Sequence, residues 1–191
     1  MNMYERWEVE RKHHDRVFSQ KPLKHSFVPE EFYRTRPYGM RKLLDKMGPI
    51  SGLRILDVGC GLGYFSLYFA SQGAIVYVLD ISMEALRSFY SPRNVIKLLA
   101  PGEVLLKDAS VDVAWGAAVL HHLDIPIAAK EFYRVLRPGG RCFFYEPSGY
   151  NPVINLWRRL TPHRRTPTER PLVLSDLEPL RKVFGRGVSV V

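Results

Sequence analysis

The alternation of apolar and polar positions divides the chain into a regular central part and two less regular flanks. Between residues 51 and 147, the apolar runs predict buried strands at 54–58, 74–79, 94–99, 111–115 and 141–145. The amphipathic segments between them predict helices at 64–72, 83–89 and 127–136. Strands that alternate with helices at this spacing predict an α/β fold, a doubly wound and mostly parallel sheet with helices on both faces. Ligands of such sheets bind at the carboxyl ends of the strands, where the strand order reverses.

The two flanks have weaker patterns. Residues 1–50 read as helical in parts, and the apolar positions within 39–47 fall on one helical face. Residues 148–191 are rich in proline and predict short helices at 153–160 and 176–184, followed by the start of a strand at 188–191. A strand without a partner is an exposed edge, so we expect a C-terminal part that is truncated or completed by another chain. We therefore expect an N-terminal helical flank (1–50), a binding core (51–147) and an incomplete C-terminal part of the same domain (148–191).

Composition narrows the class of protein. The chain has 191 residues, of which 46% are hydrophobic and 25% charged, a composition typical of one globular domain. No stretch is apolar for long enough to predict a transmembrane helix. The charged first fourteen residues lack the apolar core of a signal peptide, which favours a cytoplasmic protein. Cys60 and Cys142 predict two reduced thiols, with no disulfide and no metal site.

The net charge of +9 lies entirely in the flanks. Residues 1–50 contribute +4 and residues 151–191 contribute +5, whereas the acidic and basic residues of the centre cancel. Basic flanks are compatible with a nucleic acid, an anionic substrate or a membrane surface as partner. Net charge alone does not separate these partners.

The most informative motif for function is the loop at 59–63, Gly-Cys-Gly-Leu-Gly, which lies between a predicted strand and a predicted helix. Glycines there allow a sharp turn and the close approach of a ligand to the backbone. The dinucleotide fingerprint requires its third glycine at position 64, which is Tyr64, so a dehydrogenase is disfavoured. Asp57 would repel a pyrophosphate but suits a cationic ligand, and Asp80 ends the next strand, where an acid typically binds ribose hydroxyls.

Four segments in succession resemble the motifs of a known family. The sequences ILDVGCGLGYFS, VYVLDIS, SVDVAWGAAVLHHL and EFYRVLRPGGRCFFYEP are similar to those of class I S-adenosylmethionine-dependent methyltransferases, particularly the small-molecule (type 11) branch. The resemblance covers roughly residues 50–147. It implies a Rossmann-like sheet, an enzyme that uses S-adenosyl-L-methionine as methyl donor, and S-adenosyl-L-homocysteine as product.

The resemblance also implies the residues of the cofactor site, which are Asp57, Gly59, Cys60, Gly61, Gly63, Asp80, Ile81, Gly102, Glu103 and Ala117. The loop would hold the methionine end, Asp57 its amino group and Asp80 the ribose, with Ile81 against the adenine. The family usually places an acid near the adenine where this chain has Pro101. Here the Gly102 N–H and the Glu103 carboxylate would recognise the ring instead.

Methyl transfer to a hydroxyl or an acidic carbon can require a base. The candidates for catalysis are His121, His122 and Glu146, which follow the fourth and fifth strands. His121 would take the proton while Glu146 orients its ring, or the paired histidines only shape the pocket. In the family, an N-terminal flank folds over the cofactor as a lid. Ordinary packing is the alternative for each aromatic residue of this flank. The aromatic residues that would form the lid here are Tyr4, Trp7, Phe18, Phe32, Tyr33 and Tyr38.

We expect a small-molecule acceptor, methylated at oxygen or carbon. Arginine pairs at 158–159 and 164–165 would suit an anionic acceptor, and a basic, aromatic helix at 153–160 would suit a lipid-like one. One alternative is a binding module or pseudo-enzyme that holds S-adenosylmethionine without transfer. A nucleic-acid methyltransferase is disfavoured, because residues 116–119 lack the Asn-Pro-Pro-Tyr-like element that base methylation favours.

Overall fold

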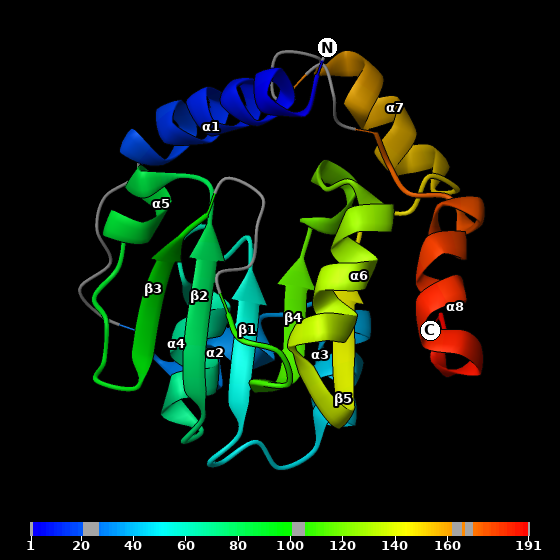
Figure 1. Cartoon of the computed structure of the whole chain (residues 1–191). Helices are drawn as coiled ribbons and strands as arrows, with labels where there is room; N and C mark the ends of the chain where they lie inside the picture. Colours follow the sequence, from blue (N-terminus) through cyan, green and yellow to red (C-terminus); the bar gives the residue numbers. More distant parts are fainter. Residues whose placement is uncertain (1, 21–26, 101–105, 162–165, 167–169, 191) are drawn as a thin grey trace.

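The computed structural model describes residues 2–20, 27–100, 106–161, 166 and 170–190 (Figure 1). Its helices and strands follow in the order α1 (Met3–Ser19), α2 (Pro29–Arg34), α3 (Tyr38–Met47), β1 (Arg54–Val58), α4 (Tyr64–Ser71), β2 (Ile75–Asp80), α5 (Met83–Arg87), β3 (Val95–Leu99), β4 (Val111–Ala117), η1 (Leu120–His122), α6 (Ile125–Val135), β5 (Leu136–Tyr145), α7 (Pro152–Leu160), η3 (Leu174–Leu177), α8 (Glu178–Phe184) and η4 (Gly185–Gly187).

The five strands form one parallel sheet in the order β3-β2-β1-β4-β5. The chain builds the sheet outward from β1 to β3 and then returns to the other side of β1 with β4. This reversal between β1 and β4 is the switch point of a doubly wound sheet. Because all strands run the same way, their carboxyl ends meet at one edge (Figure 1). The predicted α/β fold is confirmed.

Both faces of the sheet are covered, which explains why its central strand carries buried apolar residues on both faces. Successive residues of β1 point to opposite faces, so Ile55 packs with the core that contains α3 and α4, and Leu56 packs with the core that contains α6. The helices α2, α3 and α4 lie on one side and α6 and α8 on the other (Figure 1). Both Ile55 and Leu56 are fully buried.

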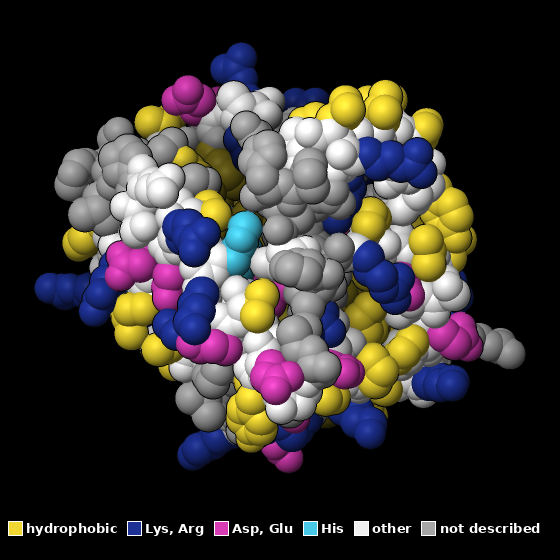
Figure 2. Space-filling model, turned by 90° about the horizontal axis from the view of Figure 1, so that it is seen from above, with side chains coloured by type: hydrophobic (Ala, Val, Ile, Leu, Met, Phe, Trp, Pro, Cys, Tyr) yellow, Lys and Arg dark blue, Asp and Glu magenta, His cyan; other side chains and the backbone are white. Residues whose placement is uncertain are grey.

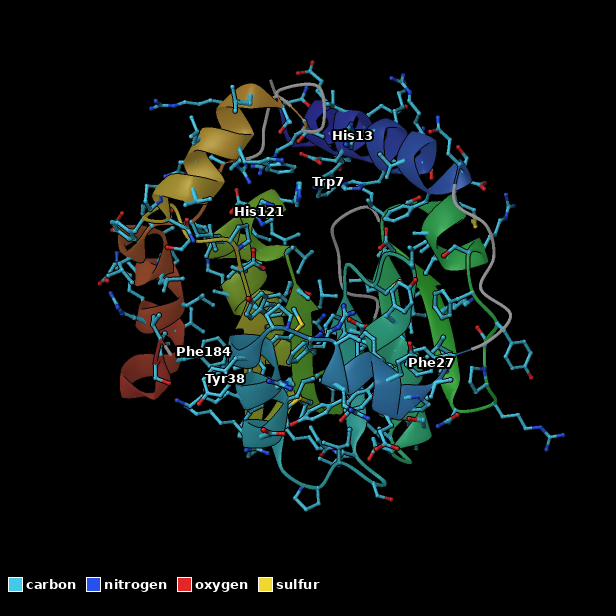
Figure 3. The ribbon with its side chains drawn as sticks, turned by 180° about the vertical axis from the view of Figure 1, so that it is seen from behind. Trp7, His13, Phe27, Tyr38, His121 and Phe184 are labelled. Carbon is cyan, nitrogen blue, oxygen red and sulfur yellow. The ribbon has the colours of Figure 1, made fainter. Side chains whose placement is uncertain are left out.

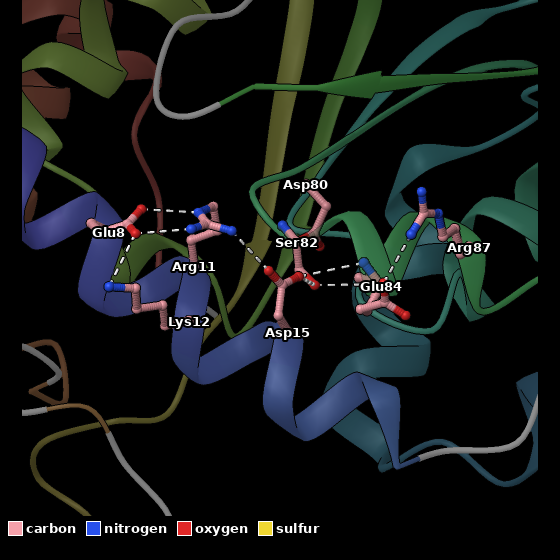
Figure 4. Close-up of polar contacts among 9 residues, drawn as sticks. Glu8, Arg11, Lys12, Asp15, Asp80, Ser82, Glu84 and Arg87 are labelled. Atoms are coloured by element: carbon pink, nitrogen blue, oxygen red, sulfur yellow. Dashed lines mark hydrogen bonds and ion pairs between the residues drawn. The ribbon is translucent and has the colours of Figure 1, made fainter.

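Helix α1 does not pack on either face but lies across the carboxyl ends of the strands (Figure 1). Two of its side chains, those of Asp15 and Arg6, attach it to the strand-end loops. The Ser82 hydroxyl donates a hydrogen bond of 2.6 Å to the Asp15 carboxylate, and the Glu84 N–H lies 3.4 Å from the same oxygen (Figure 4). The Arg6 guanidinium donates to the carbonyl of His122 at 2.9 Å. This helix therefore closes the edge at which a doubly wound sheet binds its ligands.

Three expectations about the local structure were wrong. Residues 188–190 form no strand; instead Val188 packs against the core cluster that includes residues of α6 and α8, which buries apolar surface without a strand partner. Strand β5 begins at Leu136 rather than at 141, because residues 136–140 continue the pairing with β4 through an irregular register. The helix expected from 176 begins at Glu178, after the 3-10 turn η3. Among the helices of the described ranges, none has the length and apolar character needed to cross a membrane.

Candidate functional site

The loop between β1 and α4 brings bare backbone to the edge of the sheet. Gly59 has a φ of +65° and Gly61 a φ of +52°, a region that side chains disfavour. A Cβ on Gly59 would lie 2.4 Å from a methyl group of Val119, so the turn that follows β4 excludes any side chain there. A Cβ on Gly61 would lie 3.4 Å from the ring of Phe18 on α1. The space above Gly61 is thus bounded by the sheet on one side and by α1 on the other.

Two carboxyl groups flank this loop at the ends of neighbouring strands. Asp57 and Asp80 are buried, with 2% and 7% of their surface exposed. Asp80 accepts hydrogen bonds from the N–H groups of Gly61 at 2.9 Å and Ser82 at 2.8 Å. Asp57 accepts a hydrogen bond from the Ser66 hydroxyl on α4. The acid on β2 therefore holds the loop, while the acid on β1 is held by the helix that follows it.

The electrostatics of these two acids favour a cationic ligand. Burial raises the pKa of Asp57 to about 7, although the hydrogen bond from Ser66 opposes the rise, and the nearby charge of Asp80 adds to it. Burial also raises the pKa of Asp80, against the hydrogen bonds from Ser82 and Gly61. A positively charged ligand beside them would stabilise their ionised forms.

A cavity of about 350 Å³ lies between this edge of the sheet and α1, within the size range of small-molecule sites. Seven of the residues expected to bind the cofactor line it, namely Asp57, Gly59, Cys60, Gly61, Asp80, Ile81 and Ala117. Gly63 is not part of the lining; a Cβ there would lie 2.4 Å from ring atoms of Phe89, so packing within the core is what excludes a side chain. Gly102 and Glu103, expected near the adenine, lie outside the described residues.

The two adjacent histidines have different surroundings. The His121 Nδ1 lies 2.6 Å from Glu146 Oε2, and the other oxygen of Glu146 accepts hydrogen bonds from the N–H groups of Val119 and Leu120. The His121 side chain is 4% exposed and is not part of the cavity lining. His122 does line the cavity, and its ring centroid lies 4.2 Å from that of His121. The structure thus brings His121 and Glu146 together and directs His122 to the cavity.

Helix α1 contributes side chains to the same cavity. Trp7, Glu10, His14 and Phe18 line it from above, and Figure 3 shows Trp7 pointing from α1 toward the strand ends. Figure 2 looks onto this face, with histidine near its centre and Lys and Arg side chains on several sides. On the far side of the cavity, α6 contributes Ile127, Ala128, Glu131 and Phe132. The cavity therefore extends from the glycine loop, past His122, to α6.

Comparison with known proteins agrees with this arrangement. Residues 56–144 match the family model described as a methyltransferase domain. This segment is a class I S-adenosylmethionine-dependent methyltransferase domain. It runs from within β1 to within β5 and includes the glycine loop, both buried acids and both histidines.

Relatives and solved structures match the methyltransferase domain over part of their length. A malonyl-[acyl-carrier protein] O-methyltransferase of Pectobacterium atrosepticum is 33% identical over 65% of this chain and 51% of its own. An S-adenosyl-L-methionine-dependent Diels-Alderase, iliD, of a Neonectria species is 36% identical over 55% of this chain and 43% of its own. The crystal structure of an S-adenosylmethionine-dependent methyltransferase from Mesorhizobium loti has a TM-score of 0.52 at 28% identity, covering 56% of this chain and 52% of that one. The chain spans about half the length of the curated relatives it matches, or less.

Outside the matched segment, the N-terminal flank differs from a simple aromatic lid. Of the six aromatic residues considered for that role, Trp7 and Phe18 line the cavity. Phe32 and Tyr33 pack on the aromatic rings of α4, and Tyr4 and Tyr38 are 74% and 71% exposed.

The two arginines of the pair at 158–159 have different surroundings: Arg158 is buried and Arg159 is exposed. The pair at 164–165 lies outside the described ranges.

The sequence analysis missed Glu10 and His14, which line the cavity. Their four-residue spacing, which places two side chains on one helical face, is the signal that could have found them.

Proposed function

We propose that this domain transfers a methyl group from S-adenosyl-L-methionine to an oxygen or carbon atom of a small-molecule acceptor. The observation that carries the proposal is the pair of buried acids, Asp57 and Asp80, on either side of a glycine loop in one cavity that continues to His122. The printed names of relatives from Pectobacterium and Pseudescherichia, both malonyl-[acyl-carrier protein] O-methyltransferases, support O-methylation. An anionic acceptor would suit O-methylation, and it would also suit the basic flanks of the chain.

The residues present fit the proposed cofactor. Asp80 ends β2, and its oxygens, although each already accepts one backbone N–H, retain lone pairs for the hydroxyls of a ribose. Asp57 is a buried acid beside the loop and suits the amino group of a methionine moiety. Gly61 leaves room for the chain of that moiety against the backbone. Ile81 lines the same end of the cavity and offers an apolar surface to the adenine.

The acceptor would lie at the other end of the cavity, between His122 and α6. When bound, S-adenosylmethionine supplies a methyl group on a positively charged sulfur. The chain then contributes mainly by holding the acceptor in line with this group and by excluding water. Of the catalytic candidates, we propose that His122 contacts the acceptor, because it lines the cavity. His121 and Glu146 would act as positioning residues that orient the turn carrying His122.

The cofactor proposal is tested by calorimetric titration with S-adenosylhomocysteine. We expect binding to the wild type and weakening by a factor of roughly 5 to 150 in Asp80→Ala, the scale for removing a charged hydrogen-bond partner, about 1–3 kcal/mol. Asp108→Ala is the matched control, since this acid is 78% exposed. The absence of heat at sub-millimolar ligand in the wild type would overturn the proposal.

The transfer step is tested with a labelled methyl donor and a panel of small carboxylic acids and their thioesters. We expect His122→Ala to lower kcat while leaving the affinity for S-adenosylhomocysteine unchanged. His121→Ala should lower kcat through a misplaced turn, and His121→Gln, which can still donate a hydrogen bond to Glu146, should restore part of it. Unchanged turnover in His122→Ala would remove His122 from the acceptor site.

A second candidate function is binding of S-adenosylmethionine without methyl transfer. The relative from Neonectria supports it, because its printed name describes an S-adenosyl-L-methionine-dependent Diels-Alderase rather than a methyltransferase. Binding of S-adenosylhomocysteine with no transfer to any member of the panel would favour this candidate.

A further inference from the structure

Three metal-ligating side chains that the sequence keeps far apart converge at the roof of the cavity. Glu10 and His14 lie four residues apart on α1, and His122 belongs to η1 below it. The Glu10 Oε2 lies 3.2 Å from His122 Nδ1 and 3.5 Å from His14 Nε2. One ligand atom of each residue falls within 4.8 Å of the other two, and all three residues line the cavity.

The spacing of these atoms matches a coordination sphere. Two ligand atoms that each lie about 2.0–2.1 Å from a tetrahedral zinc ion are separated by about 3.3 Å. Both separations from Glu10 Oε2 are close to that value. The His122 Nδ1 is buried and has no hydrogen bond within the part of the chain that the structure describes, although the carboxylate oxygen is near. The His122 Nδ1 is therefore close to Glu10 Oε2 but is not aligned with it for a hydrogen bond. Two atoms that bind the same metal ion have this relation.

The surroundings hold these side chains in place. The Thr166 hydroxyl donates a hydrogen bond of 2.8 Å to the Oε1 of Glu10, which leaves Oε2 directed toward the two histidines. The Glu10 side chain is only 5% exposed. The Arg6 guanidinium donates to the carbonyl of His122, so that α1 and η1 are also fixed to each other beside the cluster. Hydrogen bonds of this kind to a ligating group are typical of metal sites.

We propose that Glu10, His14 and His122 bind a divalent transition-metal ion, with zinc as the representative case. Two imidazoles and one carboxylate suit zinc and its neighbours rather than magnesium or calcium, which prefer oxygen ligands. Three protein ligands leave at least one coordination position, and the cavity supplies the space for it. The sequence predicted no metal because a Glu-x-x-x-His pair alone is a common feature of solvent-exposed helices, and the third ligand is 108 residues further along the chain from His14.

The position of the proposed ion gives it a role at the acceptor end of the cavity. The open coordination position would bind an anionic oxygen of the acceptor, such as a carboxylate, and hold it beside His122. This role rests on the proposed methyl transfer, whereas binding of the ion does not. The ion would also join α1 to the sheet, and so close the cavity from above.

The test is a titration of the chelator-treated full chain with Co²⁺ and Zn²⁺. Co²⁺ bound by nitrogen and oxygen ligands is followed by its visible ligand-field absorption, and Zn²⁺ by calorimetry. We expect one ion per chain, a tenfold or greater loss of affinity in His14→Ala and in Glu10→Gln, and unchanged affinity in His13→Ala. His13 is the matched control, because it precedes His14 on the same helix and is not part of the three-residue cluster. Circular dichroism establishes that each variant is folded, and His14→Asn replaces His14→Ala if the latter is not.

Three outcomes distinguish the possibilities. Absence of Co²⁺ and Zn²⁺ binding at micromolar concentration, or equal affinity in wild type and His14→Ala, would overturn the metal site and leave only a buried contact between histidines and a carboxylate. Titration of the same samples with S-adenosylhomocysteine separates this failure from a failure of the proposed function. A metal-binding chain without affinity for S-adenosylhomocysteine would retain the ion site and overturn the cofactor site.

Discussion

Replacing Asp57 by asparagine should stabilise the free domain above neutral pH and weaken its cofactor site. Asparagine has nearly the same shape, and its carbonyl can still accept the hydrogen bond from the Ser66 hydroxyl. The substitution removes only the charge that burial opposes. The wild type therefore retains an acid that costs stability in the absence of ligand, as functional sites often do.

The size of the effect follows from the pKa of Asp57, which burial raises from 3.8 to about 7. The folded chain then binds this proton more tightly than the unfolded chain does. The stabilisation associated with the bound proton is complete below pH 4, falls as the pH rises toward 7, and is lost above pH 7. A difference of about three pKa units corresponds to at most about 4 kcal/mol, of which about 2 to 3 kcal/mol would be lost between pH 5 and pH 8.

The assay is urea denaturation of the ligand-free wild type and of Asp57→Asn at pH 5, 6, 7 and 8. We expect the variant to gain stability over the wild type as the pH rises, by about 2 to 3 kcal/mol across this range. Asp108→Asn, at an exposed position, should follow the wild type. Parallel pH profiles for wild type and Asp57→Asn would refute the argument. In titrations with S-adenosylhomocysteine, wild-type affinity should rise between pH 6 and 8, whereas the affinity of Asp57→Asn should be weak and independent of pH.

Other predictions concern the loop and the thiols. Gly61→Val should abolish binding of S-adenosylhomocysteine in calorimetry while the circular dichroism spectrum is retained, because its side chain would fill the space between the loop and Phe18; undiminished binding would contradict the assigned loop. Gly59→Ala should lower the free energy of unfolding by about 1–3 kcal/mol, since the added methyl group overlaps Val119 at a positive φ. Burial raises the pKa of Cys142 to about 12 and that of Cys60 well above its ordinary value. Both thiols should therefore react with Ellman's reagent at pH 8 only on unfolding, and rapid reaction of the native chain would contradict this.

The sequence by itself determined the scaffold and the cofactor end of the cavity. Hydrophobic periodicity is a local property, so it located the strands and most helices to within a few residues. Asp57 and Asp80 could be placed near each other because both lie at the carboxyl ends of strands in one parallel sheet, and such ends meet at one edge. The glycine loop was recognisable because its spacing is contiguous in the chain.

Only the tertiary structure decided which residues face the proposed acceptor end of the cavity. Adjacent residues of a 3-10 turn point in directions about 120° apart, so the sequence could not tell that His122 faces the cavity while His121 turns to Glu146. The end of β5 supplies that partner, and its pairing with β4 sets the distance. Glu10 and His14 reach His122 because α1 crosses the strand ends, held by Asp15 and Arg6. Contacts between segments so distant in sequence depend on how the helix docks, and no local pattern encodes that position.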